Sequence, residues 1–220
     1  LWVTAKGIRK RYSDEVKIKD YVDQLILLSN DGDIPKYATN LVFMSSAKSP
    51  KKVEDNILYS ILQTQPKRAD VYWFVHIETT DEPYTMEYQV NTIAPNDVYK
   101  VNFSLGFQEQ HPMNVFMKKV VEELVENDEL SLYSKYHSMS SKYPTGDFRF
   151  VLVQEFLSNE NELPWFEQLI MSTYLTVKGW VASPKNWFGL DSDSVAIEEA
   201  PLVLQPVREV RLKRVRRGQG

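Results

Sequence analysis

The 220-residue sequence has no cysteine, three histidines and eight glycines. Without cysteine there is no disulfide, no thiolate nucleophile and no cysteine-based metal site, and a reducing compartment is the natural setting. The glycines are too few for an extended phosphate-cradling loop, and neither GxGxxG nor a Walker A pattern occurs. No apolar run approaches the roughly 18 residues needed to span a bilayer. We therefore expect this stretch of chain to fold in water.

The sequence also lacks an excess of positive charge. Its formal net charge is −4 and its pI is about 5.5, so no global basic field exists to attract nucleic acid, and we expect none as a partner. Hydrophobic residues make up 43% and charged residues 25%, which is ordinary for a soluble globular domain. The length suits one large domain or two small ones.

Signals for catalysis and metal binding are equally sparse. His76, His111 and His137 form no HExxH or HxH spacing, and no GxSxG nucleophile motif is present. Asp191 and Asp193 in LDSDS could hold a cation, but two acids in a turn are more typical of solvated loop residues. We therefore predict no catalytic residue, no metal ligand and no cofactor.

Both ends of the chain are basic. Leu1 to Val3 are apolar, and Lys6 and the cations of residues 9–11 follow them at once. This order is typical of a membrane helix leaving the bilayer on the cytoplasmic side, and the alternative is a frayed basic terminus. The C-terminal RLKRVRRGQG is compatible with anionic lipid nearby.

Hydrophobic periodicity predicts an α/β protein. Helices are predicted at Ser13–Ser29, from Ser49 and Pro50 through Leu62, at Pro112–Asn127 and at Leu163–Trp180. Strands are predicted at Tyr37–Met44, Val71–Ile77, Thr85–Val90, Val98–Phe107, Asp147–Leu157 and Val207–Val215. Strands that are apolar at nearly every position are typical of a sheet covered on both faces. The expected fold is one α/β domain with a central mixed sheet, helices on both faces and an antiparallel hairpin portion.

The stretch KRADVYWFVHIET could be a stacking surface or a buried strand. Tyr72, Trp73 and Phe74 are successive, so in a strand they point to both faces and cannot form one stacking surface. We therefore predict a core strand, with Lys67 and Arg68 in solvent before it. His76 near its carboxyl end is either functional or a core histidine satisfied by a backbone carbonyl.

The loop SSAKSPKK has the residue types of a phosphate site. Ser45, Ser46, Lys48 and Ser49 lie between a strand and a predicted helix start, where free N–H groups, hydroxyls and cations can hold an anion. The alternative is a capped helix start with solvated lysines. If the two strands are parallel neighbours, His76 lies at the same edge of the sheet.

Four segments carry a resemblance to a known family. They are IPKYATNLVFM, ILYSILQTQPKRADVYWFVHIETTDEPYTMEYQV, VNFSLGFQEQHPMNVFMKKVVEELV and GDFRFVLVQ. Together they resemble the cytoplasmic carboxy-terminal domain of Kup-type bacterial potassium uptake transporters. The similarity is detailed from about Arg9 to Leu157 and looser from Ser158 to Arg217.

The resemblance implies a homodimeric potassium uptake protein, a potassium–proton symporter and not an enzyme. Its ion pathway would lie in transmembrane helices outside this chain. Residues 1–12 would connect to the last membrane helix, residues 13–215 would form a single regulatory domain, and residues 216–220 would be a basic tail. The domain would lie on the cytoplasmic face of the bacterial plasma membrane.

Relatives from Gram-positive bacteria are inhibited by cyclic di-AMP, so the resemblance also implies this regulatory ligand. The loop around Ser45, Ser46, Lys48 and Ser49 is our first candidate for its phosphates. Arg68 with Tyr72 is the second and Arg149 with His76 the third, on the chemistry of cations beside aromatic rings. Two alternatives remain: a purely structural dimerisation domain without a small ligand, and a soluble enzyme acting on phosphate-containing substrates.

Overall fold

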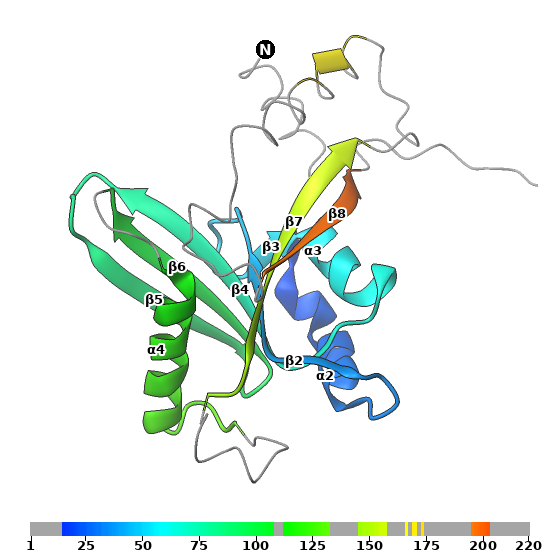
Figure 1. The fold of residues 1–220 in the computed structure, drawn as a ribbon, viewed down its shortest axis with the longest axis horizontal. Coiled ribbons are helices and arrows are strands. Elements are labelled where there is room, and N and C mark those ends of the chain that lie inside the picture. The colour runs from blue at the N-terminus through cyan, green and yellow to red at the C-terminus, as the bar shows by residue number, and fades with distance from the viewer. Residues whose placement is uncertain are drawn as a thin grey trace, which may run out of the picture.

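The computed structural model describes residues 15–107, 112–132, 145–157, 166, 169–170, 173 and 195–202. Within these residues a six-stranded sheet runs in the order β5-β6-β4-β2-β7-β8, and β1 and β3 form a separate antiparallel pair (Figure 1). The strands are β1 (Glu15–Lys17), β2 (Lys36–Met44), β3 (Lys52–Glu54), β4 (Arg68–Thr80), β5 (Met86–Ala94), β6 (Val98–Gly106), β7 (Phe148–Leu157) and β8 (Val195–Leu202). The helices are the 3-10 turn η1 (Ile18–Tyr21), α2 (Val22–Asn30), α3 (Asp55–Tyr59), the π-helical η2 (Ser60–Thr64) and α4 (Met113–Glu126).

The large sheet is parallel except at one edge. β2 pairs in parallel with β4 on one side and β7 on the other, β4 pairs with β6, and β7 pairs with β8. β5 returns antiparallel to β6, which confirms the predicted hairpin. In register, Phe43 of β2 lies opposite Phe74 of β4 and Val151 of β7. The mixed sheet expected from the sequence is therefore confirmed.

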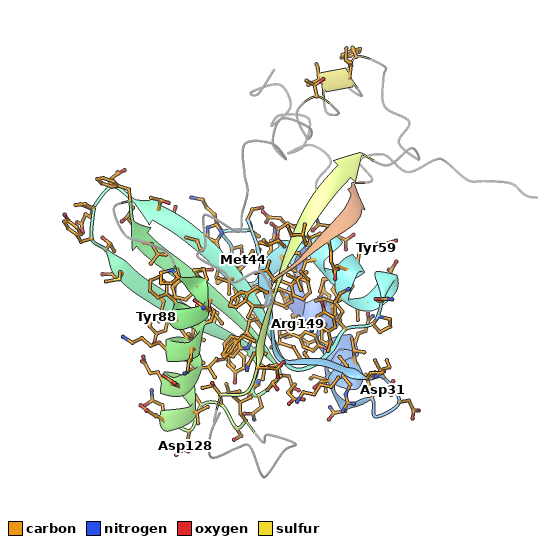
Figure 2. All side chains as sticks on the ribbon, in the orientation of Figure 1. Asp31, Met44, Tyr59, Tyr88, Asp128 and Arg149 are labelled. Atoms are coloured by element: carbon orange, nitrogen blue, oxygen red, sulfur yellow. The ribbon has the colours of Figure 1, made fainter. Side chains whose placement is uncertain are left out.

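Helices cover both faces of the sheet, as the apolar strands predicted. Tyr72 and Phe74 pack with residues of α2 and α3, whereas Trp73 packs on the other face with residues of α4. Apolar side chains fill the space between the sheet and the helices (Figure 2). The successive aromatics of β4 thus serve two separate cores, which confirms the core strand and excludes one stacking surface.

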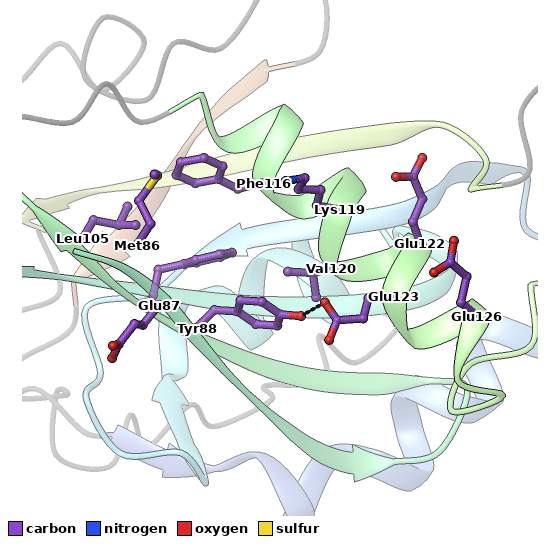
Figure 3. A pocket seen from close by; sticks show the side chains of 11 residues that line it. Met86, Glu87, Tyr88, Leu105, Phe116, Lys119, Val120, Glu122, Glu123 and Glu126 are labelled. Carbon is purple, nitrogen blue, oxygen red and sulfur yellow. Dashed lines mark hydrogen bonds between the residues drawn. The ribbon is translucent and has the colours of Figure 1, made fainter. Parts of the chain in front are cut away.

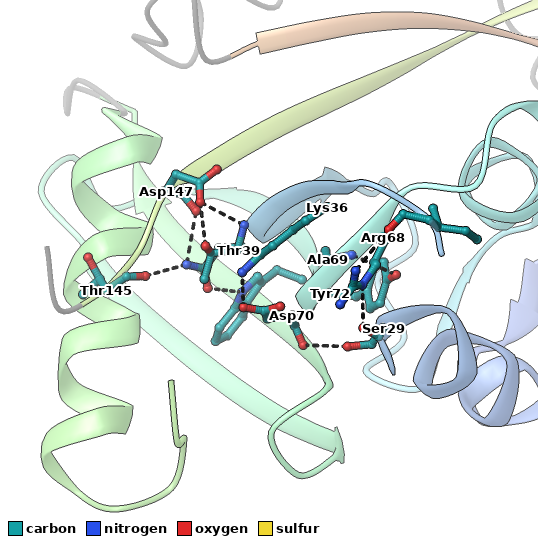
Figure 4. Close-up of polar contacts among 12 residues, drawn as sticks. Ser29, Lys36, Thr39, Arg68, Ala69, Asp70, Tyr72, Thr145 and Asp147 are labelled. Carbon is teal, nitrogen blue, oxygen red and sulfur yellow. Dashed lines mark hydrogen bonds and ion pairs between the residues drawn. The ribbon is translucent and has the colours of Figure 1, made fainter. Parts of the chain in front are cut away.

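A polar junction fixes β7 against β2. The backbone N–H of Thr39 donates to Asp147 Oδ1 at 3.0 Å, and the Thr39 hydroxyl donates to the same oxygen at 2.6 Å. The Asn40 amide donates to Thr145 O at 2.6 Å and accepts from Trp73 Nε1 at 3.0 Å (Figure 4). Thr39, Asn40, Trp73 and Thr145 are buried, whereas Asp147 is exposed. Because the buried polar groups need partners, these hydrogen bonds fix the register of the two strands.

Two predicted helix starts were wrong for one reason. Residues 15–17 form β1 and residues 52–54 form β3, and the two strands pair with Val16 opposite Val53. The first helical turn therefore begins at Ile18 and α3 begins at Asp55, so Ser49 does not cap a helix. This pairing joins segments about 37 residues apart, and such tertiary contacts override local capping signals. Ser13 lies outside the described residues.

Two further predictions of side-chain environment were wrong. Lys67 and Arg68 are 3% and 7% exposed and do not lie in solvent, because backbone carbonyls of neighbouring segments bind both. Val115 points outward at 52% exposure, whereas Val120 and Leu124 of the same helix are buried as expected.

The strand β8 was not predicted from the sequence. Most of the predicted helix at 163–180, the predicted strand at 207–215, Asp191, Asp193, His111 and His137 lie outside the described residues.

Gly106 at the end of β6 offers a test of packing. An added Cβ would lie 2.2 Å from the carbonyl oxygen of Pro83, so the backbone would have to move. Gly106→Ala should lower the free energy of unfolding by about 1–3 kcal/mol, as overpacking usually does. Gly32→Ala is the matched control, because nothing lies within 4 Å of its added Cβ. Urea unfolding of both variants measures the difference, and equal stabilities would contradict this packing.

Candidate functional site

The carboxyl ends of β2 and β4 meet at one edge of the sheet, as parallel pairing requires. Ser45 directly follows β2, and its N–H donates to Val75 O at 2.7 Å. His76 Nδ1 lies 3.0 Å from Ser45 O. The predicted neighbourhood of the serine loop and His76 is therefore present. The expected partner of a core histidine, a backbone carbonyl, is present as well.

The serine hydroxyls already donate hydrogen bonds to a carboxylate of the same chain. Ser45 Oγ donates to Glu54 Oε2 at 2.7 Å, Ser46 N donates to Glu54 Oε1 at 2.5 Å, and the Ser46 hydroxyl also donates to Oε1. Burial raises the pKa of Glu54, but the hydrogen bonds from Ser46 and Ser45 outweigh burial and leave the pKa below its usual 4.5. These donors are of the kind that a phosphate would use, and here they hold an internal anion.

Lys100 of β6 is the fourth member of this polar cluster and contacts the loop through its ammonium group. Its side chain is fully buried, and Nζ donates to Ser45 Oγ at 3.1 Å and to the carbonyls of Ala47 and Lys52 at 2.9 Å each. Burial lowers the pKa of Lys100 to about 8, although the carboxylates of Glu54 and Glu15 act in the opposite direction. We call Ser45, Ser46, Glu54 and Lys100 the carboxyl-edge cluster.

Sequence reasoning missed two members of this cluster. Glu54 was read as part of a helix, so its carboxylate was not connected with the serines. Lys100 stands alone in the apolar run VYKVNF, and a lone lysine within a buried strand is a signal for a paired buried charge. Neither residue could be placed beside Ser45 without knowing the strand order.

Three polar atoms beside the cluster have no hydrogen-bond partner among the described residues. They are His76 Nε2, Asn102 Oδ1 and Asn91 Nδ2, all buried. His76 lies opposite Asn102 in the pairing of β4 with β6, so the two side chains share a face of the sheet. Because Nδ1 donates its proton to Ser45 O, Nε2 of a neutral His76 is an acceptor. Buried acceptors without donors are rare and indicate a place where water or a ligand binds.

Exposed cations flank the same edge. Lys48 forms a salt bridge with Glu78 at 2.5 Å, in which both side chains are more than half exposed. Ser49 and Lys51 are also accessible, since the loop runs over the surface. An exposed salt bridge of this kind contributes little stability, so a phosphate could replace Glu78 as the partner of Lys48.

Arg68 and Tyr72 lie at the opposite, amino end of β4 (Figure 4). Arg68 donates from Nε to Ser29 O at 3.0 Å and from Nη1 to Ile34 O at 3.1 Å. The Tyr72 hydroxyl donates to Lys67 O at 2.9 Å, and burial raises the pKa of this phenol to about 12. Both side chains therefore hold backbone segments together, away from the serine loop.

Arg149 is not brought together with His76. It lies opposite Leu41 in β2, and Leu41 lies opposite Tyr72, four residues before His76. That offset is about 13 Å along the strand, in addition to two strand spacings. Arg149 instead lies over the ring of Tyr37, with its guanidinium carbon 4.7 Å from the ring centroid. In this cation–π pair Arg149 is exposed and Tyr37 is half-buried.

Glu54 should stabilise the folded chain through this cluster. Glu54→Gln removes the charge that accepts from both serines and leaves Lys100 without its anion, so we expect a loss of about 1–3 kcal/mol in unfolding free energy. Because the folded pKa of Glu54 is below its usual 4.5, the contribution is full above pH 4.5 and is lost as the pH falls through the folded pKa. Urea unfolding at several pH values measures both effects. Glu78→Gln, at an exposed site, is the control, and an equal loss there would refute the role of burial.

The lowered pKa of Lys100 predicts that the free energy of unfolding changes with pH in the alkaline range. Its folded pKa is about 8 and its usual value is 10.5, so between these values the unfolded chain binds the proton and the folded chain does not. The unfolding free energy contributed by this group therefore rises with pH over that interval. The rise should vanish in Lys100→Met and persist in Lys118→Met, whose side chain is exposed. Parallel stability curves for wild type and Lys100→Met would contradict the lowered pKa.

Within the described parts of the chain, no three acidic or histidine side chains group as metal ligands. No helix there has the length and apolarity of a membrane span. In the carboxyl-edge cluster the Ser45 and Ser46 hydroxyls donate to Glu54, and Lys100 Nζ donates to Ser45 Oγ, so these polar groups are paired with one another.

Comparison with known proteins gives consistent matches. Residues 38–211 match the family described as the K+ potassium transporter C-terminal domain. The chain is 45% identical over 215 residues to the probable potassium transport system protein Kup of Cytophaga hutchinsonii, and 44% identical to that of Flavobacterium johnsoniae. The protein of the same name from Clostridium perfringens is 42% identical over 215 residues. No solved structure matches the chain.

These matches cover nearly all of this chain but only a part of each relative. They include 98% of this chain but 33% of the Cytophaga and Flavobacterium proteins and 32% of the Clostridium protein. The chain thus spans about a third of the length of the curated relatives it matches. Those relatives are named as transport proteins and not as enzymes. The family match over most of the chain and the identities of 42–45% show that the chain belongs to the family of potassium transporter C-terminal domains.

Proposed function

We propose that the chain is the cytoplasmic regulatory and dimerisation domain of a bacterial potassium transporter. The relatives it matches are named potassium transport proteins and are about three times as long, which leaves room for a transmembrane portion that moves potassium. Coupling to protons, as a symporter, and a position on the inner face of the plasma membrane belong to the same proposal. The basic residues between Lys6 and Arg11 support that position, because cations are retained on the cytoplasmic side of membrane helices. The proposal also includes a connector to the last membrane helix at residues 1–12, a single regulatory domain at residues 13–215 and a basic tail at residues 216–220.

The ligand in this proposal is cyclic di-AMP, bound at the carboxyl edge of β2, β4 and β6. The observation that carries it is the buried acceptor His76 Nε2 beside the amide oxygen of Asn102, both without a hydrogen-bond partner among the described residues. An adenine offers an amino donor next to ring-nitrogen acceptors, which complements a histidine acceptor and an amide. Buried polar atoms of this kind are usually paired with water or with a ligand, and in this proposal the adenine is their partner.

The phosphates would use the exposed side of the loop. Lys48 would exchange Glu78 for a phosphate, and Ser49 and Lys51 lie on the same loop. Ser45 and Ser46 could join them only if the Glu54 carboxylate left, so in the present conformation they act through the loop and not through direct contact. Arg68, Tyr72 and Arg149 remain weaker candidates, because they lie away from this edge.

The same edge is connected to the start of the chain. β3 ends at Glu54, and β3 pairs with β1, which begins at Glu15 directly after the basic N-terminal segment. A ligand that moves the loop from Ser45 to Glu54 would therefore move the residues next to the proposed membrane junction. For regulation, the ligand must bind two arrangements of the domain with different affinity. A ligand shared by two chains would meet that requirement by favouring one dimer geometry.

Calorimetric titration with cyclic di-AMP tests this proposal, with AMP as the control ligand. We expect micromolar or tighter binding with about one ligand per two chains, which corresponds to about −8 kcal/mol. Lys48→Gln and His76→Gln should each weaken binding by about tenfold or more. Lys118→Gln removes the same charge from an exposed site on α4 and should leave binding unchanged.

Sedimentation with and without ligand tests the dimer directly. A dimer in both states with no heat of binding would favour the purely structural alternative. Equal effects of Lys48→Gln and Lys118→Gln would show that the site is elsewhere. Binding by a monomer, with one ligand per chain, would refute the shared-ligand arrangement.

A further inference from the structure

A groove lies between β5, β6 and α4, on the opposite face of the sheet from α2 and α3 (Figure 3). Its volume is about 680 Å³. Phe103, Leu105 and Val120 form a buried floor, whereas Met86 and Tyr88 of β5 remain 59% and 39% exposed. An exposed apolar patch of this kind, at the edge strand of a sheet, is typical of an interaction surface.

The rim of this groove is acidic. Glu87 lines it from β5, and Glu122, Glu123 and Glu126 line it from α4, against the one cation Lys119 among the described lining residues. The Tyr88 hydroxyl donates to Glu123 across the groove (Figure 3). Burial raises the pKa of Tyr88 to about 12, and the hydrogen bond to Glu123 and its charge add to that rise.

An apolar floor with an acidic rim selects its occupant by charge. An anionic lipid surface would be repelled, and the same groove of a second copy would carry the same four glutamates. The complementary partner is an extended segment in which apolar residues alternate with cations.

We infer that the groove binds the basic segment Val207–Arg217 of this chain, supplied by the same copy or by another. This segment lies outside the described residues, and its sequence, VREVRLKRVRR, has the required chemistry. Its apolar residues are Val207, Val210, Leu212 and Val215, and its cations are Arg208, Arg211, Lys213, Arg214, Arg216 and Arg217. Glu209 is the single acid. The cations of the N-terminal segment are concentrated at residues 9–11 and are not interspersed in this way.

The length of the chain allows this contact within one copy. β8 ends at Leu202 on the edge of the sheet opposite to β5, and five strand spacings amount to about 24 Å. The ten residues from Val203 to Leu212 span up to about 33 Å when extended, so within one copy Leu212 and the residues after it can reach the groove across the α4 side of the sheet. Residues 207–211 would then lie along that path, and the whole segment can enter the groove only of a second copy. The same segment can reach a second copy.

Cysteine cross-linking tests the inference cleanly, because the chain has no native cysteine. One double variant combines Met86→Cys in the groove with Leu212→Cys in the segment. The control combines Leu27→Cys with Leu212→Cys, since Leu27 is 72% exposed on α2 at the opposite face. Under mild oxidation the groove pair should cross-link about tenfold faster, because docking raises the local thiol concentration. Denaturing gels distinguish links within one chain from links between two.

Charge removal tests the basis of the contact. Glu122→Gln with Glu126→Gln should abolish the rate difference, as should high salt. Asp20→Asn with Asp23→Asn removes two exposed charges near α2 and should have no effect. Equal rates for the groove and control pairs would overturn the inference. So would faster linking of Ile8→Cys than of Leu212→Cys to Met86→Cys, or a segment that is protected from modification only when phosphatidylglycerol vesicles are added.

Discussion

A buried ammonium group organises the carboxyl edge of this domain. Lys100 comes from the middle of β6, and its three protons are directed to oxygens of the loop after β2 and of β3. A buried cation is tolerated only where such partners and a nearby anion compensate its lost hydration. Glu54 provides that anion, and its other contacts arrange Ser45 and Ser46. The β1–β3 pair, the carbonyl that binds His76 and the exposed position of Lys48 all depend on this arrangement of the loop.

The two faces of the sheet therefore have different surface chemistry. On the α2 and α3 side, the carboxyl ends of the strands carry polar groups, and three buried polar atoms there have no hydrogen-bond partner within the part of the chain that the structure describes. On the α4 side, the antiparallel strand β5 extends the sheet beyond the parallel strands and forms an apolar groove with an acidic rim. A small ligand at the first surface and a basic segment at the second would act on strands β5 and β6 from opposite faces. That arrangement suits a domain that combines several signals, since each would bias the same strands.

Sequence patterns were most reliable where burial decides the structure. The continuous apolar runs that became β2, β4 and β7 could be recognised because strands covered on both faces need apolar residues at every position. The helix α4 followed from its 3.6-residue period, although Val115 was assigned to the wrong face. Local signals failed at residues 15–17 and 49–54, where pairing between distant segments replaced the predicted helical turns. Lys67 and Arg68 were misjudged for a similar reason, because their carbonyl partners come from other parts of the chain.

The sequence by itself determined the fold class, the two-sided burial of the central strands, the absence of cysteine chemistry and the family of the chain. These properties follow from composition and periodicity, which each segment carries without reference to its neighbours, and from similarity along the chain. The tertiary structure decided which polar residues act together. Strand order placed Lys100 beside Ser45 and Glu54, separated Arg68 and Arg149 from His76, and formed the groove between β5 and α4. Such neighbours depend on the pairing of segments far apart in the chain, and local residue preferences contain no record of that pairing.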